Sequence, residues 1–174
     1  MNNHNNTVKD VAIHNGYAAF WGSIFSNFYP VKINIDGKEF NCTEQYFMYM
    51  KAVTFNDMET ADEILNETGP KIIKNLGRKV KNYDDEKWSE IRYDIMKKAC
   101  YAKFTQDEKC KNALLHDSLK YCKFVEGNPY DKVWSVGIEW TNPAIGNPEN
   151  WKGENLLGKI LDEIRFEMKF ENYK

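Results

Sequence analysis

The sequence is poor in the residues that usually bind metals or form redox-active pairs. It contains four cysteines, with no CxxC pair among them, and only three histidines. Zinc sites are normally built from closely spaced cysteine and histidine ligands, so this composition disfavours a zinc ion. No cysteine has a nearby histidine that would indicate a thiol nucleophile. We therefore expect reduced, mostly buried thiols, no metal site and no cofactor.

Long apolar runs are also missing, because no stretch approaches the ~20 residues that a membrane span requires. The first ten residues are rich in asparagine and lack the apolar segment of a secretory signal. We expect residues 1–14 to form a disordered leader and residues 15–174 to form one domain. We also expect a soluble, cytoplasmic protein with no membrane partner.

Neither sign of charge dominates the chain. The sequence has 24 Lys+Arg against 26 Asp+Glu and a formal net charge of -2. This balance argues against a protein that holds nucleic acid by bulk electrostatics, although it does not exclude a local basic patch. Hydrophobic residues make up 42% and aromatic residues 14%, which is enough to fill a core and excludes wholesale disorder.

Arginine is scarce, and the three arginines are Arg78, Arg92 and Arg165. A guanidinium fork holds phosphate or carboxylate in a bidentate manner, which lysine cannot do. Each arginine is therefore a candidate anion ligand, with an ordinary salt bridge as the alternative. Arg92 has a third interpretation, since it lies one turn after Trp88 and is placed to stack on that ring.

Apolar periodicity and turn residues predict a mainly helical chain with a few short strands. Strands are expected at residues 18–21, at 31–35 and 38–42 around an Asp36-Gly37 turn, and at 121–126 and 133–138. Helices are expected at residues 44–55 behind a Thr43 N-cap, at 57–67, 70–77 and 84–103, and at 154–170. A capping box of Thr105 and Glu108 predicts a further helix that reaches Leu115. The fold class is therefore α+β, a single mainly helical domain with a small β-sheet.

The helix expected at residues 44–55 is the most informative segment. Glu44 and Lys51 share one face with Phe47, Met48 and Phe55, and the other face is also largely apolar. Seven residues separate the acid from the base, about 10.5 Å along the axis, which is too far for an ordinary direct salt bridge. Either each charge reaches solvent or a partner on another element, or both line a pocket. We favour the pocket, because this helix leaves neither residue an obvious solvent-facing side.

Two acids flank the turn around Gly127-Asn128-Pro129. Glu126 precedes this turn, Asp131 follows it, and Trp134 comes next. Acids at a turn usually cap the backbone or face solvent. An acid beside an aromatic ring also suits a sugar or a base, because the ring stacks on the flat group and the carboxylate stabilises positive charge.

The segment from Trp151 to Gly158 predicts a turn that enters the last helix. Its backbone amides are placed to receive an anion, with Asn155 beside them. An asparagine at such a position more often caps the local backbone, so this signal alone is weak.

Together these segments resemble the NADAR (YbiA-like) family. The matching stretches run in order from about residue 18 to the last helix and cover nearly the whole chain. They are Phe25-Ser26-Asn27-Phe28-Tyr29-Pro30, Cys42-Thr43-Glu44-Gln45-Tyr46-Phe47-Met48 with Lys51-Ala52, Leu76-Gly77-Arg78, Trp88, Ile95-Met96, Lys103-Phe104, Glu126, Asp131 with Trp134, Trp151-Lys152-Gly153-Glu154-Asn155-Leu156-Leu157-Gly158, and Arg165. Any one stretch is weak, and their ordered set is quite specific.

The resemblance implies a YbiA-like fold and an N-glycosidase that hydrolyses the C–N bond between ribose and a base-like amine. It implies two substrate classes, phosphorylated intermediates of early riboflavin biosynthesis and ADP-ribose attached to a nucleobase. The expected partner is therefore a phosphorylated ribosyl small molecule or an ADP-ribosyl group, and contact with ADP-ribosylated DNA is compatible with it. By position, Glu44, Trp88 and Asp131 match residues considered catalytic or substrate-positioning. Lys51 matches a lysine for which covalent participation through ring-opened ribose is plausible.

From these observations we expect Glu44, Lys51 and Asp131 to be catalytic, with the two carboxylate roles not divided between the acids. The expected substrate-binding residues are Asn27, Arg78, Trp88, Glu126, Trp134 and Asn155. An alternative is a non-catalytic module that binds ADP-ribose or a nucleotide. Such a module would depend on its rings and on Arg78, while Glu44 and Lys51 would be dispensable for affinity.

The sequence departs from the family pattern at three places. Phe25 stands where leucine is usual, Ser135-Val136-Gly137 stands where Gly-Ile-Gly is usual, and Gly127 stands where alanine is common. None of these changes removes an expected catalytic residue. We expect Phe25 to alter the volume near the pocket, and Ser135 to keep the backbone farther from the ligand.

Overall fold

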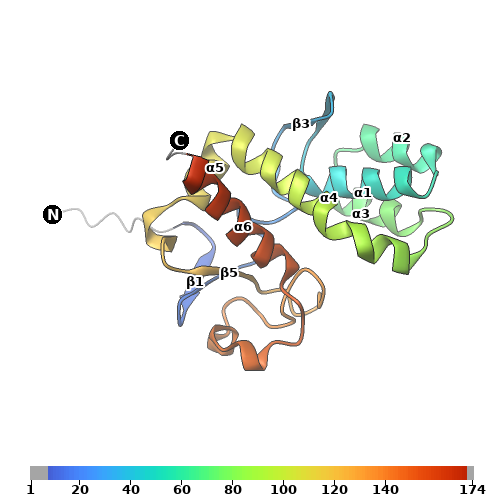
Figure 1. Ribbon diagram of the computed structural model, residues 1–174. Helices are drawn as coiled ribbons and strands as arrows, with labels where there is room; N and C mark the ends of the chain where they lie inside the picture. The colour runs from blue at the N-terminus through green and yellow to red at the C-terminus, as the bar shows by residue number, and fades with distance from the viewer. Residues whose placement is uncertain (1–7, 172–174) are drawn as a thin grey trace. The chain divides into compact units, whose positions relative to one another are not determined.

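The computed structural model describes residues 8–171 of the chain, which fold into two compact units (Figure 1). Unit 1 combines the chain up to Ser26 with the chain from Lys109 onward, and unit 2 runs from Asn27 to Glu108. Helices and short strands make up both, as the α+β prediction requires. Each unit has its own buried side chains.

Unit 2 is a helical unit with one β-hairpin. It contains β3 (Ile33–Ile35), β4 (Lys38–Phe40), α1 (Thr43–Thr54), α2 (Met58–Asn66), α3 (Pro70–Arg78) and α4 (Asp85–Gln106). The hairpin is antiparallel, and both residues of its turn have positive φ, 52° at Asp36 and 79° at Gly37, as a two-residue hairpin turn requires. Helices α2, α3 and α4 all pack against α1, which places α1 at the centre of the unit.

Helix α1 begins one residue earlier than the sequence predicts. Its N-cap is Cys42 with extended backbone, so the prediction of Thr43 as the N-cap is wrong. The Thr43 hydroxyl bonds instead to Asn27, donating to its carbonyl at 3.1 Å or its Oδ1 at 3.0 Å. The Asn27 carbonyl also accepts the Glu44 N–H at 3.1 Å. Asn27 therefore provides the hydrogen-bond acceptor that the helix start needs.

Helix α4 is longer than predicted, and the expected capping box does not exist. Thr105 lies inside α4 and its hydroxyl donates to the Tyr101 carbonyl at 2.6 Å. This i−4 bond within the helix replaces the N-cap role that the prediction assigned to Thr105. The next helix, α5 (Glu108–Leu114), starts only after Asp107, which ends α4.

Unit 1 is built on a three-stranded sheet. Its strands are β1 (Val11–His14), β2 (Tyr17–Phe20) and β5 (Lys123–Glu126), in the order β1-β2-β5. Strands β1 and β2 are antiparallel, whereas β2 and β5 are parallel with Ala18 opposite Phe124. Helix α6 (Leu156–Glu171) lies against β5 (Figure 1). The short 3-10 helices η1 (Asp117–Leu119), η2 (Pro143–Gly146) and η3 (Pro148–Asn150) complete the unit.

Two predictions about unit 1 are corrected by the structure. Residues 11–14 form β1 rather than part of a disordered leader, and residues 1–7 lie outside the described residues. The strand predicted at residues 133–138 is absent. Its backbone bonds to several different segments instead, as when the Val136 N–H donates to Glu126 and the Val136 carbonyl accepts from Lys152. Apolar alternation there reflects burial of Val136 and Ile138 in a loop.

The core of unit 1 lies beside its sheet. Ala19, Val125, Val136, Ile138 and Ile145 form one buried cluster, against which Tyr17, Trp140 and Trp151 pack. The rings of Phe20, Phe25 and Phe124 form a second contact set, with the Phe25 and Phe124 centroids 4.9 Å apart. Within the described part of the chain, none of the helices combines the length and apolar character that crossing a membrane needs.

Candidate active site

The nine expected site residues divide between the units. Asn27, Glu44, Lys51, Arg78 and Trp88 belong to unit 2, and Glu126, Asp131, Trp134 and Asn155 belong to unit 1. The two groups differ in what surrounds their polar atoms, so each is built up separately below.

Glu44 is a buried acid in the first turn of α1. Glu44 is only 5% exposed, and Asn27 beside it is 9% exposed. The positive end of the helix dipole and the backbone amides of the first turn favour a carboxylate at this position. Glu44 is therefore an acid at a helix N-terminus that is largely removed from water.

Lys51 lies two turns further along α1, against an aromatic ring. Its Nζ is 3.9 Å from the centroid of the Tyr83 ring, a cation–π distance. Burial lowers the pKa of Lys51 below its ordinary value, while the negative charges of Asp85 and Glu44 act in the opposite direction. Lys51 thus reaches a partner on another element, one of the two arrangements the sequence left open. A lowered pKa also makes the neutral, nucleophilic amine more accessible near neutral pH.

Tyr83 is itself held in place by an acid. Its hydroxyl donates to Asp85 Oδ1 at 2.5 Å. Tyr83 is 42% exposed, and partial loss of hydration followed by this bond to Asp85 raises its pKa to about 12, while the charge of Arg92 acts in the opposite direction. The phenol therefore stays protonated in the physiological range, and its ring is fixed as a platform for Lys51.

Trp88 joins these residues through an aromatic cluster formed by Phe47, Phe55, Tyr83 and Trp88. The Trp88 centroid lies 5.0 Å from that of Phe47 and 6.4 Å from that of Phe55. Phe55 in turn lies 5.3 Å from Tyr83. Trp88 is only 4% exposed, so most of its ring contributes to packing. The cluster forms an apolar wall beside Lys51, which explains the loss of hydration at that amine.

Arg78 is placed apart from this cluster. It ends α3, is exposed, and donates from Nη1 to Asn75 Oδ1 at 3.3 Å. Its guanidinium is accessible to an anion, and its role as a phosphate ligand stays a prediction.

In unit 1, Asp131 caps the turn that follows β5. Its Oδ1 accepts the N–H groups of Val133 and Trp134, both at 2.9 Å. This is the turn-capping role that sequence reasoning weighed against a chemical one. One carboxylate oxygen thus holds Trp134 in place, and the catalytic role of Asp131 stays a prediction.

The Asn155 side chain bonds to the backbone of β5, including that of Glu126. Asn155 Oδ1 accepts the Glu126 N–H at 3.1 Å, and Asn155 Nδ2 donates to the Phe124 carbonyl at 3.0 Å. Asn155 is 4% exposed and has φ of 55°, a left-handed conformation that asparagine tolerates. Its amide therefore joins the start of α6 to the edge of β5. A substrate-binding role for Asn155 or Glu126 stays a prediction.

Ser135 is a residue whose importance the sequence did not reveal. It is fully buried, accepts the Asn128 N–H at 2.7 Å and donates to the Glu126 carbonyl at 2.5 Å. The family pattern has glycine here, and glycine has no hydroxyl to make these bonds. The departure to serine thus adds side-chain bonds that hold the loop after β5.

The other two departures also have packing reasons. Phe25 is 1% exposed and packs on Phe20 and Phe124 inside unit 1. At Gly127, an added Cβ would lie 2.3 Å from the Trp140 Cα, so the alanine common in the family has no room in this chain. Both departures adjust the interior of unit 1.

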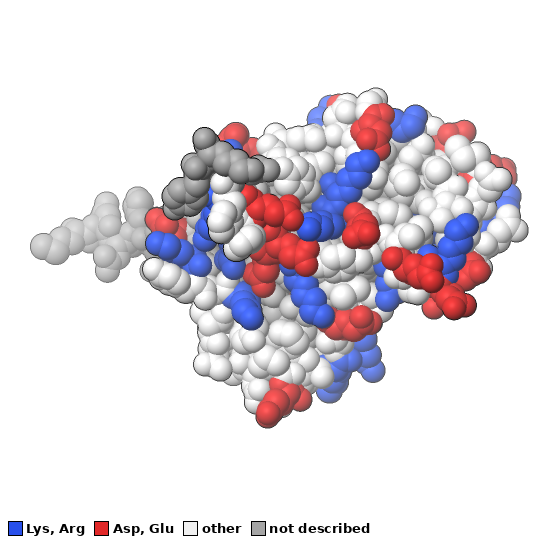
Figure 2. Space-filling view, viewed as in Figure 1, with Lys and Arg blue, Asp and Glu red and all other residues white. Residues whose placement is uncertain are grey.

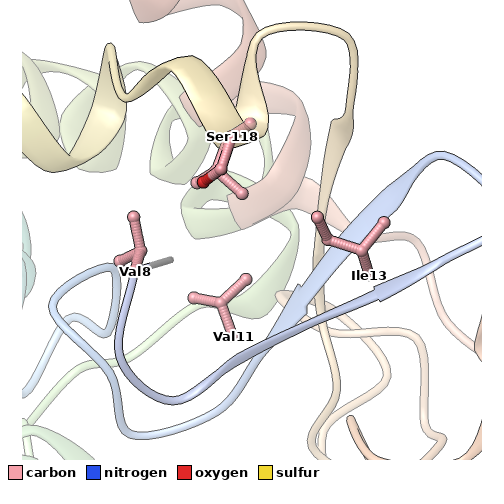
Figure 3. Close-up of a pocket in the computed structure, with 5 residues that line it drawn as sticks. Val8, Val11, Ile13 and Ser118 are labelled. Carbon is pink, nitrogen blue, oxygen red and sulfur yellow. The ribbon is translucent and has the colours of Figure 1, made fainter. Parts of the chain in front are cut away.

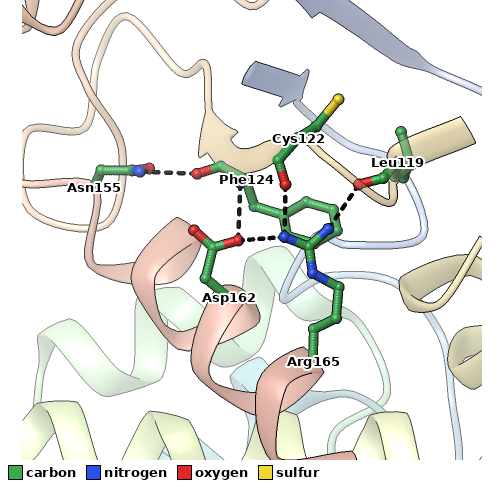
Figure 4. Close-up of polar contacts among 6 residues, drawn as sticks. All are labelled: Leu119, Cys122, Phe124, Asn155, Asp162 and Arg165. Atoms are coloured by element: carbon green, nitrogen blue, oxygen red, sulfur yellow. Dashed lines mark hydrogen bonds and ion pairs between the residues drawn. The ribbon is translucent and has the colours of Figure 1, made fainter. Parts of the chain in front are cut away.

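Arg165 forms a salt bridge, which is the alternative to the anion-ligand role considered for the arginines. Its guanidinium donates to the carbonyls of Leu119 and Cys122 at 2.8 and 2.5 Å and to Asp162 Oδ1 at 3.0 Å (Figure 4). The Phe124 ring lies 4.6 Å below its carbon centre. Burial lowers the pKa of Arg165 and raises that of Asp162, while the opposite charge of each partner counteracts the change. Arg165 therefore connects α6 to the segment that precedes β5 through hydrogen bonds.

A pocket of about 260 Å³ in unit 1 does not coincide with these residues. Val8, Val11, Ile13, Ser118 and Leu119 line it (Figure 3). The lining contains no titratable side chain, and Ser118 is bonded to His116 Nδ1. The pocket therefore supplies none of the groups that hydrolysis of a glycosidic bond needs.

Charges of both signs are mixed on the part of the surface seen in Figure 2, where acidic and basic side chains are interspersed. Among residues 8–171, no group of three or more His, Cys, Asp or Glu side chains is arranged to hold a metal ion.

Comparisons with known proteins give one domain family for most of the chain. The NADAR domain model matches residues 19–169. Protein irg-1 of Caenorhabditis elegans is 38% identical over 161 residues, covering 83% of this chain and 75% of that protein. N-glycosidase R617 of Acanthamoeba polyphaga mimivirus is 37% identical over 150 residues, covering 83% of this chain and 86% of that protein. The NMR structure of the Escherichia coli protein YbiA superposes with a TM-score of 0.76 at 26% identity, covering 95% of this chain and 92% of that chain.

Proposed function

This chain belongs to the NADAR family, and we propose that it hydrolyses the C–N bond between a (phospho)ribose and a base-like amine. It is a hydrolase that acts on N-glycosyl bonds, the activity named for its relative R617. The observation that carries the proposal is the placement of buried Glu44 and half-buried Lys51 on one helix, with the aromatic cluster beside the amine.

The reaction breaks the bond between the anomeric carbon and nitrogen, and the electron pair leaves with nitrogen. In the simplest route the Lys51 ammonium protonates that nitrogen, while the Glu44 carboxylate stabilises the oxocarbenium-like carbon. Water then adds to the carbon and gives its proton to Glu44. The products are the free sugar and the neutral amine. Glu44 then loses its proton to solvent and Lys51 takes one up, which restores the carboxylate and the ammonium.

Lys51 also suits a covalent route. Its neutral amine attacks C1 of the ring-opened riboside, the base leaves as a protonated amine, and water hydrolyses the resulting imine. The lowered pKa of Lys51, caused chiefly by burial, supports this route because more of the amine is neutral at a given pH. Borohydride reduction during turnover separates the routes, since only the imine yields a stable mass adduct on Lys51.

The remaining expected residues take supporting roles in the proposal. Asp131 is the second carboxylate, Trp134 and Trp88 contact the base or ribose, and Arg78 binds the phosphate. Glu126, Asn27 and Asn155 position the substrate. The support for Arg78 is its exposed guanidinium, and the support for Trp134 is the turn that Asp131 fixes.

The substrate proposed is a compact phosphorylated riboside, of the type found early in riboflavin biosynthesis, or an ADP-ribosyl group on a nucleobase. A near-neutral chain with 24 basic and 26 acidic residues favours a small ligand over a long nucleic-acid track. ADP-ribosylated DNA is included because a modified base presents the same glycosidic bond as the small molecules.

The test is release of the base from a panel of ribosylamine phosphates, NAD, ADP-ribose and ADP-ribosylated DNA. We expect Glu44→Gln and Lys51→Ala to lower the rate at least ~100-fold, the range typical for positioned acid–base groups. Glu39→Gln, at an exposed glutamate paired with Lys32, is the matched control. Wild-type rates in folded Glu44→Gln and Lys51→Ala proteins would overturn the assignment.

The same panel addresses the non-catalytic alternative. Calorimetry with ADP-ribose measures affinity independently of turnover. Tight binding without base release, and with affinity unchanged in Lys51→Ala, would show a binding module instead of a hydrolase.

A further inference from the structure

Lys103 is a deeply buried lysine that the mechanism above does not use. It lies on α4 and is only 1% exposed. Its Nζ lies 5.2 Å from the Tyr29 ring centroid and 5.1 Å from the Phe104 ring centroid. A buried ammonium costs several kcal/mol unless an opposite charge and hydrogen bonds compensate it. A lysine held this far from water in unit 2 therefore requires an explanation.

Asn27 connects the turn of α4 before Lys103 to the start of α1. Its backbone carbonyl accepts the Glu44 N–H at 3.1 Å. Its Oδ1 lies 3.8 Å from the Cys100 sulfur, with the thiol as donor. Cys100 and Lys103 are three residues apart on α4, so they share one face of that helix. Lys103 therefore belongs to the face of α4 that meets the N-terminus of α1 beside Glu44.

The charges of Glu44 and Lys103 both affect the Cys42 thiol. Cys42 is fully buried at the N-cap of α1. Burial raises the pKa of this thiol to about 11, the negative charge of Glu44 adds to the rise, and the positive charge of Lys103 opposes it. The charges of Glu44 and Lys103 thus act on the pKa of the same thiol in opposite directions.

We propose that Lys103 is a positioning residue that keeps the Glu44 carboxylate ionised and oriented inside unit 2. This inference rests on the proposed function and deepens it, because it assigns to Glu44 the role of the ionised carboxylate, which the sequence left undivided between Glu44 and Asp131. An ionised Glu44 stabilises the oxocarbenium-like carbon and accepts the proton of the attacking water. The proton for the leaving nitrogen then comes from another group, for which Lys51 is available.

The titratable groups around Glu44 come from several elements. Cys42 precedes α1, Lys51 follows on α1, Cys100 and Lys103 lie on α4, and Tyr29 faces Lys103. The other elements that pack against α1 are α2, α3 and β4. Their buried positions are Thr60, Ala61, Ile64, Ile73, Gly77 and Phe40, none of which titrates. Lys98 of α4 also reaches α1, where it bonds to the Tyr46 hydroxyl, but it is exposed and paired with Asp36. Lys103 is thus the buried cation that α4 contributes here.

The experiment follows the Glu44 carboxyl signal by carbon NMR as the pH is varied, in the full chain. We expect Glu44 to bind its proton at least ~10-fold more tightly in Lys103→Met than in the wild type, since an adjacent cation favours the carboxylate by this amount or more. Lys103→Arg keeps a cation and is expected to restore the wild-type titration. Lys98→Met, at an exposed α4 lysine paired with Asp36, is the control.

An unchanged Glu44 titration in folded Lys103→Met would overturn the inference. If Lys103→Met does not fold, the wild-type protein decides, because a Glu44 that is protonated at pH 7 would equally overturn it. The pH profile of base release supplies a second readout, in which the acidic limb moves upward in Lys103→Met together with the Glu44 titration. Coupled titration in a protein that releases no base would keep this inference and reject the hydrolase assignment.

Discussion

The two units use their buried polar residues in different ways. In unit 1, Asn155, Ser135 and Asp131 bond mainly to backbone amides and carbonyls. In unit 2, Glu44 and Lys51 lie beside apolar side chains, and ring contacts replace backbone bonds around the Lys51 amine. Polar groups bonded to backbone stabilise loops, whereas ionisable groups in apolar surroundings have altered proton affinity.

The difference bears on which residues perform chemistry. Altered proton affinity is what a general acid, base or amine nucleophile requires, and Lys51 of unit 2 has it while its amine lies against a ring. Arg165 and Asp162 of unit 1 also have it, but they bond to each other and to backbone groups. Substitutions at Arg165 and Ser135 should therefore change stability first, and substitutions at Glu44 and Lys51 should change catalysis first.

The largest stability effect is expected at Arg165 in unit 1. Arg165→Met removes the donors to the Leu119 and Cys122 carbonyls and leaves Asp162 without its cation (Figure 4). We expect a loss of about 3 kcal/mol in unfolding free energy, because Arg165 is only 11% exposed in its side chain and leaves buried acceptors behind. Urea denaturation measures it. The exposed Arg78→Met should change unfolding free energy by less than ~0.5 kcal/mol, and equal losses at both sites would contradict this account.

A pair of glycines tests whether the interior of unit 1 is the more rigid. Gly127→Ala places a Cβ 2.3 Å from the Trp140 backbone, which cannot move away alone. We expect a loss of about 2 kcal/mol, in the range for overpacking. Gly77→Ala in α3 places its Cβ against the flexible Met48 side chain, and alanine favours helix by about 1 kcal/mol. The loss of unfolding free energy at Gly77 should therefore be smaller than at Gly127. Thermal unfolding of the two variants, with reversibility checked, measures both losses. A larger loss in Gly77→Ala would contradict the prediction.

The sequence predicted regular elements well where local signals agree with packing. The Asp36-Gly37 hairpin and Pro70 at the start of α3 are found as expected, and the helix predicted at residues 57–67 is found as α2. These devices act within a few residues, so a single sequence contains them. The error at residues 133–138 has the opposite cause, because bonds from Val136 to Glu126 and Lys152 decide the backbone there. The error at Thr105 is a local one, because the hydroxyl bonds to Tyr101 within α4 rather than capping the next helix.

The site was predicted in part for the same reason. Helical spacing placed Glu44 and Lys51 on one face of α1, and the burial of Glu44 follows from the apolar residues around it. Tyr83 and Lys103 were not found, because their contacts with α1 depend on how other helices pack. Two signals were available for Lys103. It belongs to the Lys103-Phe104 stretch that carries the family resemblance, and it interrupts an otherwise apolar run of Ala99, Cys100, Ala102 and Phe104 on α4.

The smallest effect is expected in the contribution of Lys51 to the pH dependence of the unfolding free energy. The pKa of Lys51 is lowered in the folded chain, chiefly by burial, while the unfolded chain keeps the ordinary value near 10.5. Between these two values the unfolded state binds more protons, so unfolding free energy rises as pH increases and the penalty disappears above 10.5. The wild type should therefore gain stability relative to Lys51→Met as urea denaturation is repeated from pH 8 to pH 10.5. Lys32→Met, at an exposed lysine, is the matched control, and a wild type that loses stability relative to Lys51→Met over this range would show that the amine is favoured as a cation in the fold.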